Sequence, residues 1–104
     1  MRKLYAMGEM LIDFTAQNEE GGDARFFEKN AGGAPANVAV CAARLGCRSA
    51  VVTKLGRDAF GKFLRETLAR EGVDDAFVFE TDEANTALAF VFLDGNGERD
   101  FLFY

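Results

Sequence analysis

The chain has 104 residues, of which 49% are hydrophobic and eleven are Phe, so it can bury a substantial core within one modest domain. Its formal net charge of −5, with no basic run longer than Arg2-Lys3, argues against nucleic acid or an anionic membrane surface as a partner. The absence of histidine excludes Ser-His and Cys-His nucleophilic catalysis and argues against a zinc site.

The N-terminal residues and the cysteines bear on the compartment. The stretch from Met1 to Tyr5 lacks the long apolar run and the small-residue cleavage site of a signal peptide. No apolar run reaches the roughly eighteen residues that a membrane helix needs. Cys41 and Cys47 have no metal or redox spacing, so we expect them to be small packing groups in a reducing compartment. The sequence therefore predicts a cytoplasmic protein that does not bind a membrane.

The first predicted element is a strand from Leu4 to Phe14. This segment is almost continuously apolar, as in strands buried on both faces of a parallel sheet. Asp13 stands at its carboxyl end, where α/β sheets place their ligands, although a capping or turn-initiating role fits the same position. After a polar turn, residues Arg25–Lys29 predict a second strand, which could pair with Phe14–Ala16 as a hairpin.

Residues 31–46 predict a tight glycine loop that runs into a short apolar helix. Gly32 and Gly33 lack a Cβ, so the backbone there can adopt unusual dihedrals and approach a ligand closely. Gly46 is placed to end the helix. Asn37 is polar and lies in the first turn of this otherwise apolar segment, so it either caps the helix or faces whatever the glycines approach.

Two further parallel strands and a helix follow. Ser49–Leu55 is rich in β-branched residues and predicts a buried strand, which completes a βαβ unit with the preceding strand and helix. Asp58 predicts the N-cap of a helix that covers the core and ends near Glu71. Ala76–Glu80 is the third candidate parallel strand.

The C-terminal part predicts a hairpin. Thr86–Leu93 and Arg99–Tyr104 flank the turn sequence Asp94-Gly95-Asn96-Gly97. Both faces of the first strand are apolar, so something must pack on each side. The chain stops inside an apolar strand at Tyr104, and an open edge of that kind invites pairing with another chain. We therefore expect this chain to be the N-terminal piece of a longer protein.

The motifs of this chain resemble those of a known family. Gly32-Gly33-Ala34-Pro35-Ala36-Asn37-Val38-Ala39, followed by Gly46 and Gly56, resembles the N-terminal signature of the ribokinase-like carbohydrate kinases. The opening Gly8-Glu9-Met10-Leu11-Ile12-Asp13 and the segment Thr86–Val91 resemble the fructokinase branch most. The resemblance covers the whole chain. It implies an α/β fold: the N-terminal part of a parallel-sheet core plus a small β-sheet lid, with lid strands at about 14–29 and 86–104.

The resemblance also implies six sugar-binding residues, which are Asp13, Gly32, Gly33, Asn37, Ala89 and Phe103. Asp13 and Asn37 would bind sugar hydroxyls, the glycines would let the backbone approach the sugar, and the last two would contact it from the lid. A carboxylate accepts two hydroxyl donors at once, and charge-assisted hydrogen bonds are roughly twice as strong as neutral ones. An amide both donates and accepts, as a hydroxyl does.

The chain lacks the groups that would carry the chemistry. Phosphoryl transfer needs an Asp base, donors for the γ-phosphate and a Mg²⁺ site. In the family these come from a second glycine-rich motif near the C-terminus, and no Gly-Ala-Gly-Asp occurs in this sequence. The resemblance thus implies no catalytic residue and no metal ligand here, with ATP and Mg²⁺ bound mainly by a C-terminal part that the chain does not contain.

These observations predict that the parent protein is an ATP-dependent sugar kinase. The activity that we expect is that of a fructokinase, which converts fructose to fructose 6-phosphate. A kinase for 2-keto-3-deoxygluconate or for a riboside remains open, because the same loop can hold different polyols. An alternative of another class is a non-catalytic module that self-associates through the lid. Because the lids of two subunits often pack together in the family, we also expect a homodimer.

Overall fold

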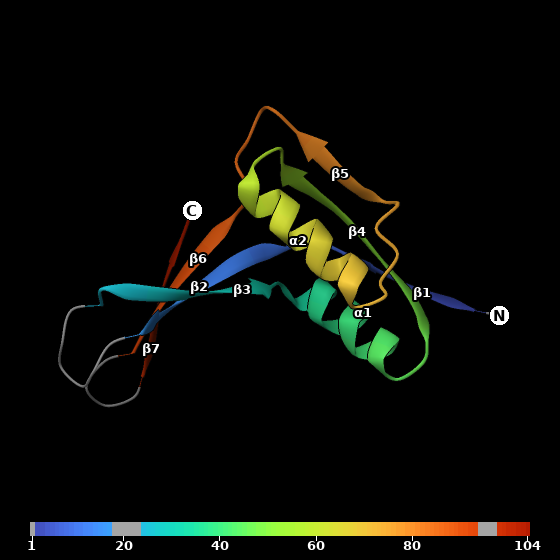
Figure 1. Cartoon of the computed structure of the whole chain (residues 1–104), viewed down its shortest axis with the longest axis horizontal. Helices are drawn as coiled ribbons and strands as arrows, with labels where there is room; N and C mark the ends of the chain where they lie inside the picture. Colours follow the sequence, from blue (N-terminus) through green and yellow to red (C-terminus); the bar gives the residue numbers. More distant parts are fainter. Residues whose placement is uncertain (1, 18–23, 94–97) are drawn as a thin grey trace.

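The computed structural model describes residues 2–17, 24–93 and 98–104. The described elements follow the chain in the order β1 (Lys3–Met7), β2 (Leu11–Gln17), β3 (Phe26–Gly32), α1 (Ala34–Arg44), β4 (Arg48–Gly56), α2 (Ala59–Arg70), β5 (Val78–Thr81), β6 (Leu88–Leu93) and β7 (Arg99–Phe103) (Figure 1). They form a three-stranded sheet in the order β1-β4-β5 and a four-stranded sheet in the order β3-β2-β6-β7. The four-stranded sheet projects away from the helices.

The three-stranded sheet and the two helices form the body of the molecule. Its strands run parallel, with β4 between β1 and β5, and both helices lie on the same side of it (Figure 1). Val51 from β4, Ala39 from α1 and Leu64 from α2 are all fully buried in one cluster. Each fully buried Leu or Val contributes about 1.5–3 kcal/mol. The predicted βαβ unit and the role of α2 as a core-covering helix are both confirmed.

The four-stranded sheet joins segments that are far apart in the sequence. Strand β2 pairs with β3 in antiparallel and with β6 in parallel orientation, and β7 pairs with β6 in antiparallel orientation. The described strands within the segments predicted for the lid, 14–29 and 86–104, therefore lie in one sheet. Most of the polar turn predicted between β2 and β3, and the turn predicted at 94–97, lie outside the described residues.

The prediction of one strand from Leu4 to Phe14 is wrong, because the chain leaves one sheet at Met7 and enters the other at Leu11. Gly8 lies at the break with φ 150°, and a β-carbon there would lie 2.7 Å from Cγ of Pro35. A continuous apolar pattern fits two short strands in different sheets as well as one long strand. Strand β1 is also half exposed, whereas the pattern predicted burial on both faces.

The helix ends follow the sequence pattern more closely. Gly46 has φ 90° just after α1, and the side chain of Asp58 accepts a hydrogen bond from the backbone N–H of Gly61 at 2.8 Å, as an N-cap does. The prediction that Cys41 and Cys47 are packing groups is wrong, since both thiols are exposed. Helix α1 turns its small residues toward the sheet instead. No helix in the described part of the chain is both long and apolar enough to cross a membrane.

Candidate functional site

A row of side chains crosses one face of the four-stranded sheet. Asn30 of β3 pairs with Asp13 of β2, Asp13 pairs with Ala89 of β6, and Ala89 pairs with Phe103 of β7. Directly paired residues point to the same side of a sheet, so these four side chains lie on one face. The structure thus brings together three of the residues predicted for the site, Asp13, Ala89 and Phe103.

Asp13 is the acidic residue in this row. Its side chain is half-buried, and burial raises the pKa of the carboxyl above its ordinary value. Within the described residues no hydrogen bond or ion pair to this carboxylate offsets that cost. A partly desolvated carboxylate without a protein partner is suited to a ligand that brings its own hydrogen-bond donors.

Gly32 creates the space for this carboxylate. A β-carbon on Gly32 would overlap Oδ2 of Asp13 and lie 2.9 Å from its Cγ. Gly33, the next residue, has φ 105°, and a β-carbon there would lie 2.6 Å from the carbonyl oxygen of Glu9. Both glycines therefore have a role inside the protein: one makes room for Asp13, and the other lets α1 start against the chain that enters β2. Their contact with a ligand stays a prediction.

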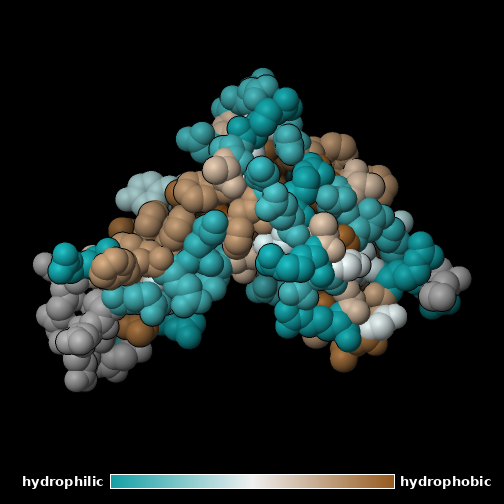
Figure 2. Space-filling model, in the orientation of Figure 1, coloured by the Kyte–Doolittle hydropathy of each residue, from teal (hydrophilic) through white to brown (hydrophobic). Residues whose placement is uncertain are grey.

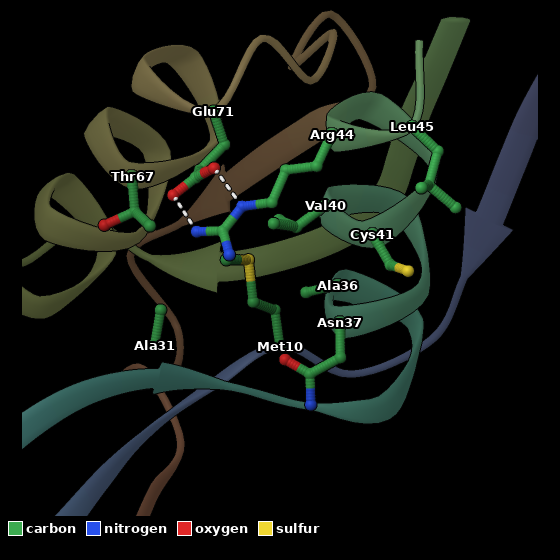
Figure 3. A pocket seen from close by; sticks show the side chains of 10 residues that line it. All are labelled: Met10, Ala31, Ala36, Asn37, Val40, Cys41, Arg44, Leu45, Thr67 and Glu71. Carbon is green, nitrogen blue, oxygen red and sulfur yellow. Dashed lines mark hydrogen bonds and ion pairs between the residues drawn. The ribbon is translucent and has the colours of Figure 1, made fainter. Parts of the chain in front are cut away.

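Asn37 lies one turn into α1, where its backbone N–H donates to the carbonyl of Gly33 at 3.0 Å. Its exposed side chain lines a hollow of about 410 Å³ between α1 and α2, near Met10 (Figure 3). Arg44 and Glu71 join the two helices at this hollow through a paired hydrogen bond of 2.8 and 2.6 Å. Because these two charges satisfy each other, they offer a ligand no free charge. The contact of Asn37 with a sugar stays a prediction.

Comparison with known proteins settles the family. Residues 1–104 match the model described as "pfkB family carbohydrate kinase". The chain belongs to this family. It is 52% identical over 103 residues to Fructokinase-1 of Oryza sativa subsp. japonica, an alignment that covers 97% of this chain and 32% of that protein.

Solved structures agree with this assignment. The fructokinase of Xylella fastidiosa matches with a TM-score of 0.89 and 48% identity, over 98% of this chain and 32% of that one. The Arabidopsis thaliana ribokinase complexed with ribose and ATP matches with a TM-score of 0.84 and 29% identity, over 97% of this chain and 35% of that one. The ribokinase-like α/β fold and the family implied by the glycine loop are confirmed. The chain spans about a third of the length of these relatives.

Sequence reasoning missed one residue that lies in the row with Asp13, which is Asn30. It lies directly opposite Asp13 and is half-buried, and its amide Nδ2 donates to the carbonyl of Glu28 at 3.4 Å. The predicted second strand ended at Lys29, whereas β3 continues to Gly32. In the structure Phe14 pairs with Lys29, so the next pair places Asn30 beside Asp13.

The opposite face of the four-stranded sheet is aromatic. Near the body it is covered, since the ring of Phe14 lies 5.5 Å from that of Phe60 on α2 and Nζ of Lys29 lies 4.0 Å from the centre of the Phe63 ring. Farther out it forms an open apolar groove of about 490 Å³, and Figure 2 shows hydrophobic surface over this sheet. The groove is lined by Phe27, Leu88, Phe90, Phe92, Leu102 and Tyr104.

Proposed function

We propose that this chain is the sugar-binding part of an ATP-dependent kinase that converts fructose to fructose 6-phosphate. The observation that carries the proposal is the half-buried carboxylate of Asp13, which has no protein partner among the described residues and stands in a row with Asn30, Ala89 and Phe103. Fructokinase relatives are identical to this chain at about half of the aligned positions, which supports fructose as the sugar. We place the enzyme in the cytoplasm.

In this proposal each predicted residue has a separate task. Asp13 accepts hydrogen bonds from two sugar hydroxyls, Asn37 binds a third, and the backbone at Gly32 and Gly33 forms the floor beneath the sugar. Ala89 is small and lies beside Asp13, so it would contact the sugar without a bulky side chain, while the exposed ring of Phe103 covers the carbon skeleton. A site built on hydroxyl recognition rejects analogues that lack the hydroxyl, because its polar groups would remain unpaired.

The transfer of the phosphoryl group needs more than these residues supply. The described residues contain no group of three acidic, Cys or His side chains that could hold a metal ion, and the sequence contains no Gly-Ala-Gly-Asp motif. We therefore propose that ATP, Mg²⁺ and the catalytic base are bound by the remaining two thirds of the protein. The four-stranded sheet then serves as a lid that orients the sugar and excludes water from it.

The outer face of the lid gives the proposed enzyme a second partner. Its groove is apolar and open, and the large side chains Phe27, Leu102 and Tyr104 are 37%, 48% and 74% exposed. Monomeric proteins rarely leave such a patch uncovered. We propose that it packs against the lid of a second copy in a homodimer.

The proposed function is tested in the full-length protein by Asp13→Ala. Hydrogen bonds to a charged group are each worth about 1.5–3 kcal/mol, so the loss of two should lower kcat/KM for fructose at least about 100-fold. The matched control is Asp100→Ala, because Asp100 is exposed and pairs with Phe92 on the opposite face of the lid. Unchanged kcat/KM for fructose in Asp13→Ala would reject the assignment.

A substrate panel decides which sugar the site takes. The wild-type protein is assayed with fructose, ribose and 2-keto-3-deoxygluconate at matched ATP concentration. The proposal expects the highest kcat/KM for fructose. A clear preference for either of the other sugars would replace fructokinase by the corresponding kinase and leave the role of Asp13 in place.

A non-catalytic function is the second candidate, and the open edge of β7 favours it for the 104-residue chain by itself. This strand lies at the end of the sheet order, and all of its residues are exposed. The isolated chain should show no ATP turnover and should self-associate. Sugar phosphorylation by the isolated chain would overturn our placement of the catalytic base outside it.

A further inference from the structure

The chain passes between the body and the four-stranded sheet in three described segments. It leaves β1 through Gly8 to enter β2, and it returns from β3 through Gly33 into α1. Both glycines have positive φ, at 150° and 105°. The third passage, from β5 to β6, contains no such glycine. Instead it is tied to the body at Thr86.

The carboxylate of Asp58 makes this tie. Its Oδ1 accepts the hydroxyl hydrogen bond of Thr86 at 2.7 Å, and its Oδ2 accepts the backbone N–H of the same residue at 2.9 Å. The hydroxyl of Thr86 also accepts the backbone N–H of Gly56 at 3.1 Å. Thr86 is 4% exposed and Asp58 is half-buried, so these bonds are partly shielded from water. Hydrogen bonds to a charged group in such a place are among the stronger ones in proteins.

Two glycines fit this junction closely. A β-carbon on Gly56 would lie 2.6 Å from Oδ2 of Asp58 and 2.8 Å from the carbonyl oxygen of Ala84. A β-carbon on Gly61 would overlap the carbonyl oxygen of Gly56 and lie 3.1 Å from Oγ1 of Thr86. The end of β4, the start of α2 and the approach to β6 thus meet without room for another atom.

These bonds exceed what a helix cap requires. The bond from Gly61 to Asp58 is sufficient to cap α2. Burial raises the pKa of Asp58, but hydrogen bonds from Thr86 and Gly61 outweigh this effect and hold the pKa below its usual range. The carboxylate is therefore ionised at neutral pH and available to hold Thr86 as well as the helix.

We propose that Asp58 is a positioning residue for the sugar site, which acts by fixing the start of β6 on the body through Thr86. This inference rests on the proposed function. Ala89 follows Thr86 by three residues and contacts the row of Asp13 and Phe103 through strand pairing. In between, the carbonyl of Ala87 accepts the N–H of Ile12 at 3.1 Å, which couples the tie to β2 directly.

The test compares Thr86→Val with Thr86→Ser in the full-length protein. Valine keeps the shape and the backbone N–H but removes the hydroxyl, whereas serine keeps the hydroxyl; the cap from Asp58 to Gly61 stays in both. We expect Thr86→Val to raise KM for fructose about tenfold with KM for ATP within about twofold of wild type, and Thr86→Ser to restore KM for fructose. Thr67→Val is the matched control, since among the described residues its hydroxyl donates to the carbonyl of Phe63 within α2 and to no other group.

Hydrogen exchange gives a readout that does not depend on activity. In Thr86→Val the amides of residues 86–93 should exchange faster, while those of α2 keep the wild-type rate. Equal KM for fructose in the valine and serine variants overturns the inference, as does a uniform rise of both KM values with faster exchange in α2. Absence of sugar phosphorylation by the wild type rejects the proposed function instead, and the exchange comparison then decides whether the tie holds β6.

Discussion

A β-carbon on Gly32 would overlap Oδ2 of Asp13. The glycine and the carboxylate thus occupy complementary space on one face of the four-stranded sheet, although they are nineteen positions apart. Strand β3 places them together, because Gly32 pairs with Leu11, two residues before Asp13. Any side chain at this glycine must move the carboxylate.

The first prediction follows from this overlap and concerns Gly32→Ala in the full-length protein. The added methyl group should displace the Asp13 carboxylate by about an ångström, and a displacement of that size in a binding group costs about 100-fold in kcat/KM. The measurement is kcat/KM for fructose, with circular dichroism to show that the fold is retained.

Gly46→Ala is the control for this variant. A β-carbon on Gly46 meets nothing within 4 Å, but its φ of 90° makes alanine strained. We expect a loss of about 1 kcal/mol in the free energy of unfolding and unchanged kcat/KM. Equal losses of kcat/KM in the two variants would show that general destabilisation, and not the Asp13 contact, explains the effect.

The second prediction concerns the charge of Asp13, whose pKa burial raises. Because the folded protein holds this proton more tightly than the unfolded chain, the ionised carboxylate lowers stability, and stability falls as pH rises through the raised pKa. Asp13→Asn removes this cost, so at pH 7 it should unfold at an equal or higher urea concentration than wild type. The same variant should have a lower kcat/KM for fructose.

The pH profile of the wild type supplies the complementary measurement. In the proposed site the ionised carboxylate binds the sugar, so kcat/KM for fructose should fall as pH falls through the raised pKa of Asp13. The Asn variant should lack this dependence. If Asp13→Asn unfolds at a lower urea concentration than wild type at pH 7, that result would contradict the assignment of Asp13 as a desolvated acid without a protein partner.

Local sequence patterns predicted the parts of this fold that depend on neighbouring residues. The cap at Asp58 and the stop at Gly46 follow from bonds and dihedrals within a few positions, and both are confirmed. The division of Leu4–Phe14 between two sheets was not predictable in this way. Apolar character does not show which sheet a strand joins, and β1 is half exposed in spite of it.

Contacts between distant residues set the limit for the candidate site as well. Asp13, Ala89 and Phe103 lie in one row only because β6 pairs with β2. These two strands are separated in the sequence by most of the body. The second partner of Asp58, Thr86, lies 28 positions away and has no local signal. Asn30 follows the predicted second strand directly, but its place opposite Asp13 depends on the register of the β2–β3 pair, which the sequence did not supply.

The third prediction uses Asn30, which faces Asp13 across the antiparallel pair. Asn30→Asp would set two carboxylates directly opposite each other in the strand pair. Like charges on directly paired residues repel each other, which raises the pKa at which the pair loses its protons. We expect the fall of kcat/KM for fructose at low pH to move to a higher pH. Asn30→Ala removes the amide without adding charge, so it should leave the position of this fall unchanged. An unshifted profile in Asn30→Asp would show that the two side chains do not share one space.

The fourth prediction tests the proposed homodimer through a pair of leucines. Leu102 lines the apolar groove on the outer face of the lid, whereas Leu93 lies on the opposite face. Their exposed fractions match closely, at 48% and 49%, so the same substitution carries the same solvation cost in the monomer. Leu102→Asp should weaken self-association at least about tenfold, because a charge buried in an apolar interface has no partner there.

Sedimentation velocity over a range of concentrations measures this difference in the full-length protein. Leu93→Asp should keep the wild-type dissociation constant, since Leu93 lies on the face of Asp13, which we assign to the sugar. If Leu93→Asp dissociates the dimer and Leu102→Asp does not, the face that we assign to the sugar is the interface. If neither variant changes the association, the subunits meet outside the lid, and the aromatic groove must then be covered by another part of the same protein.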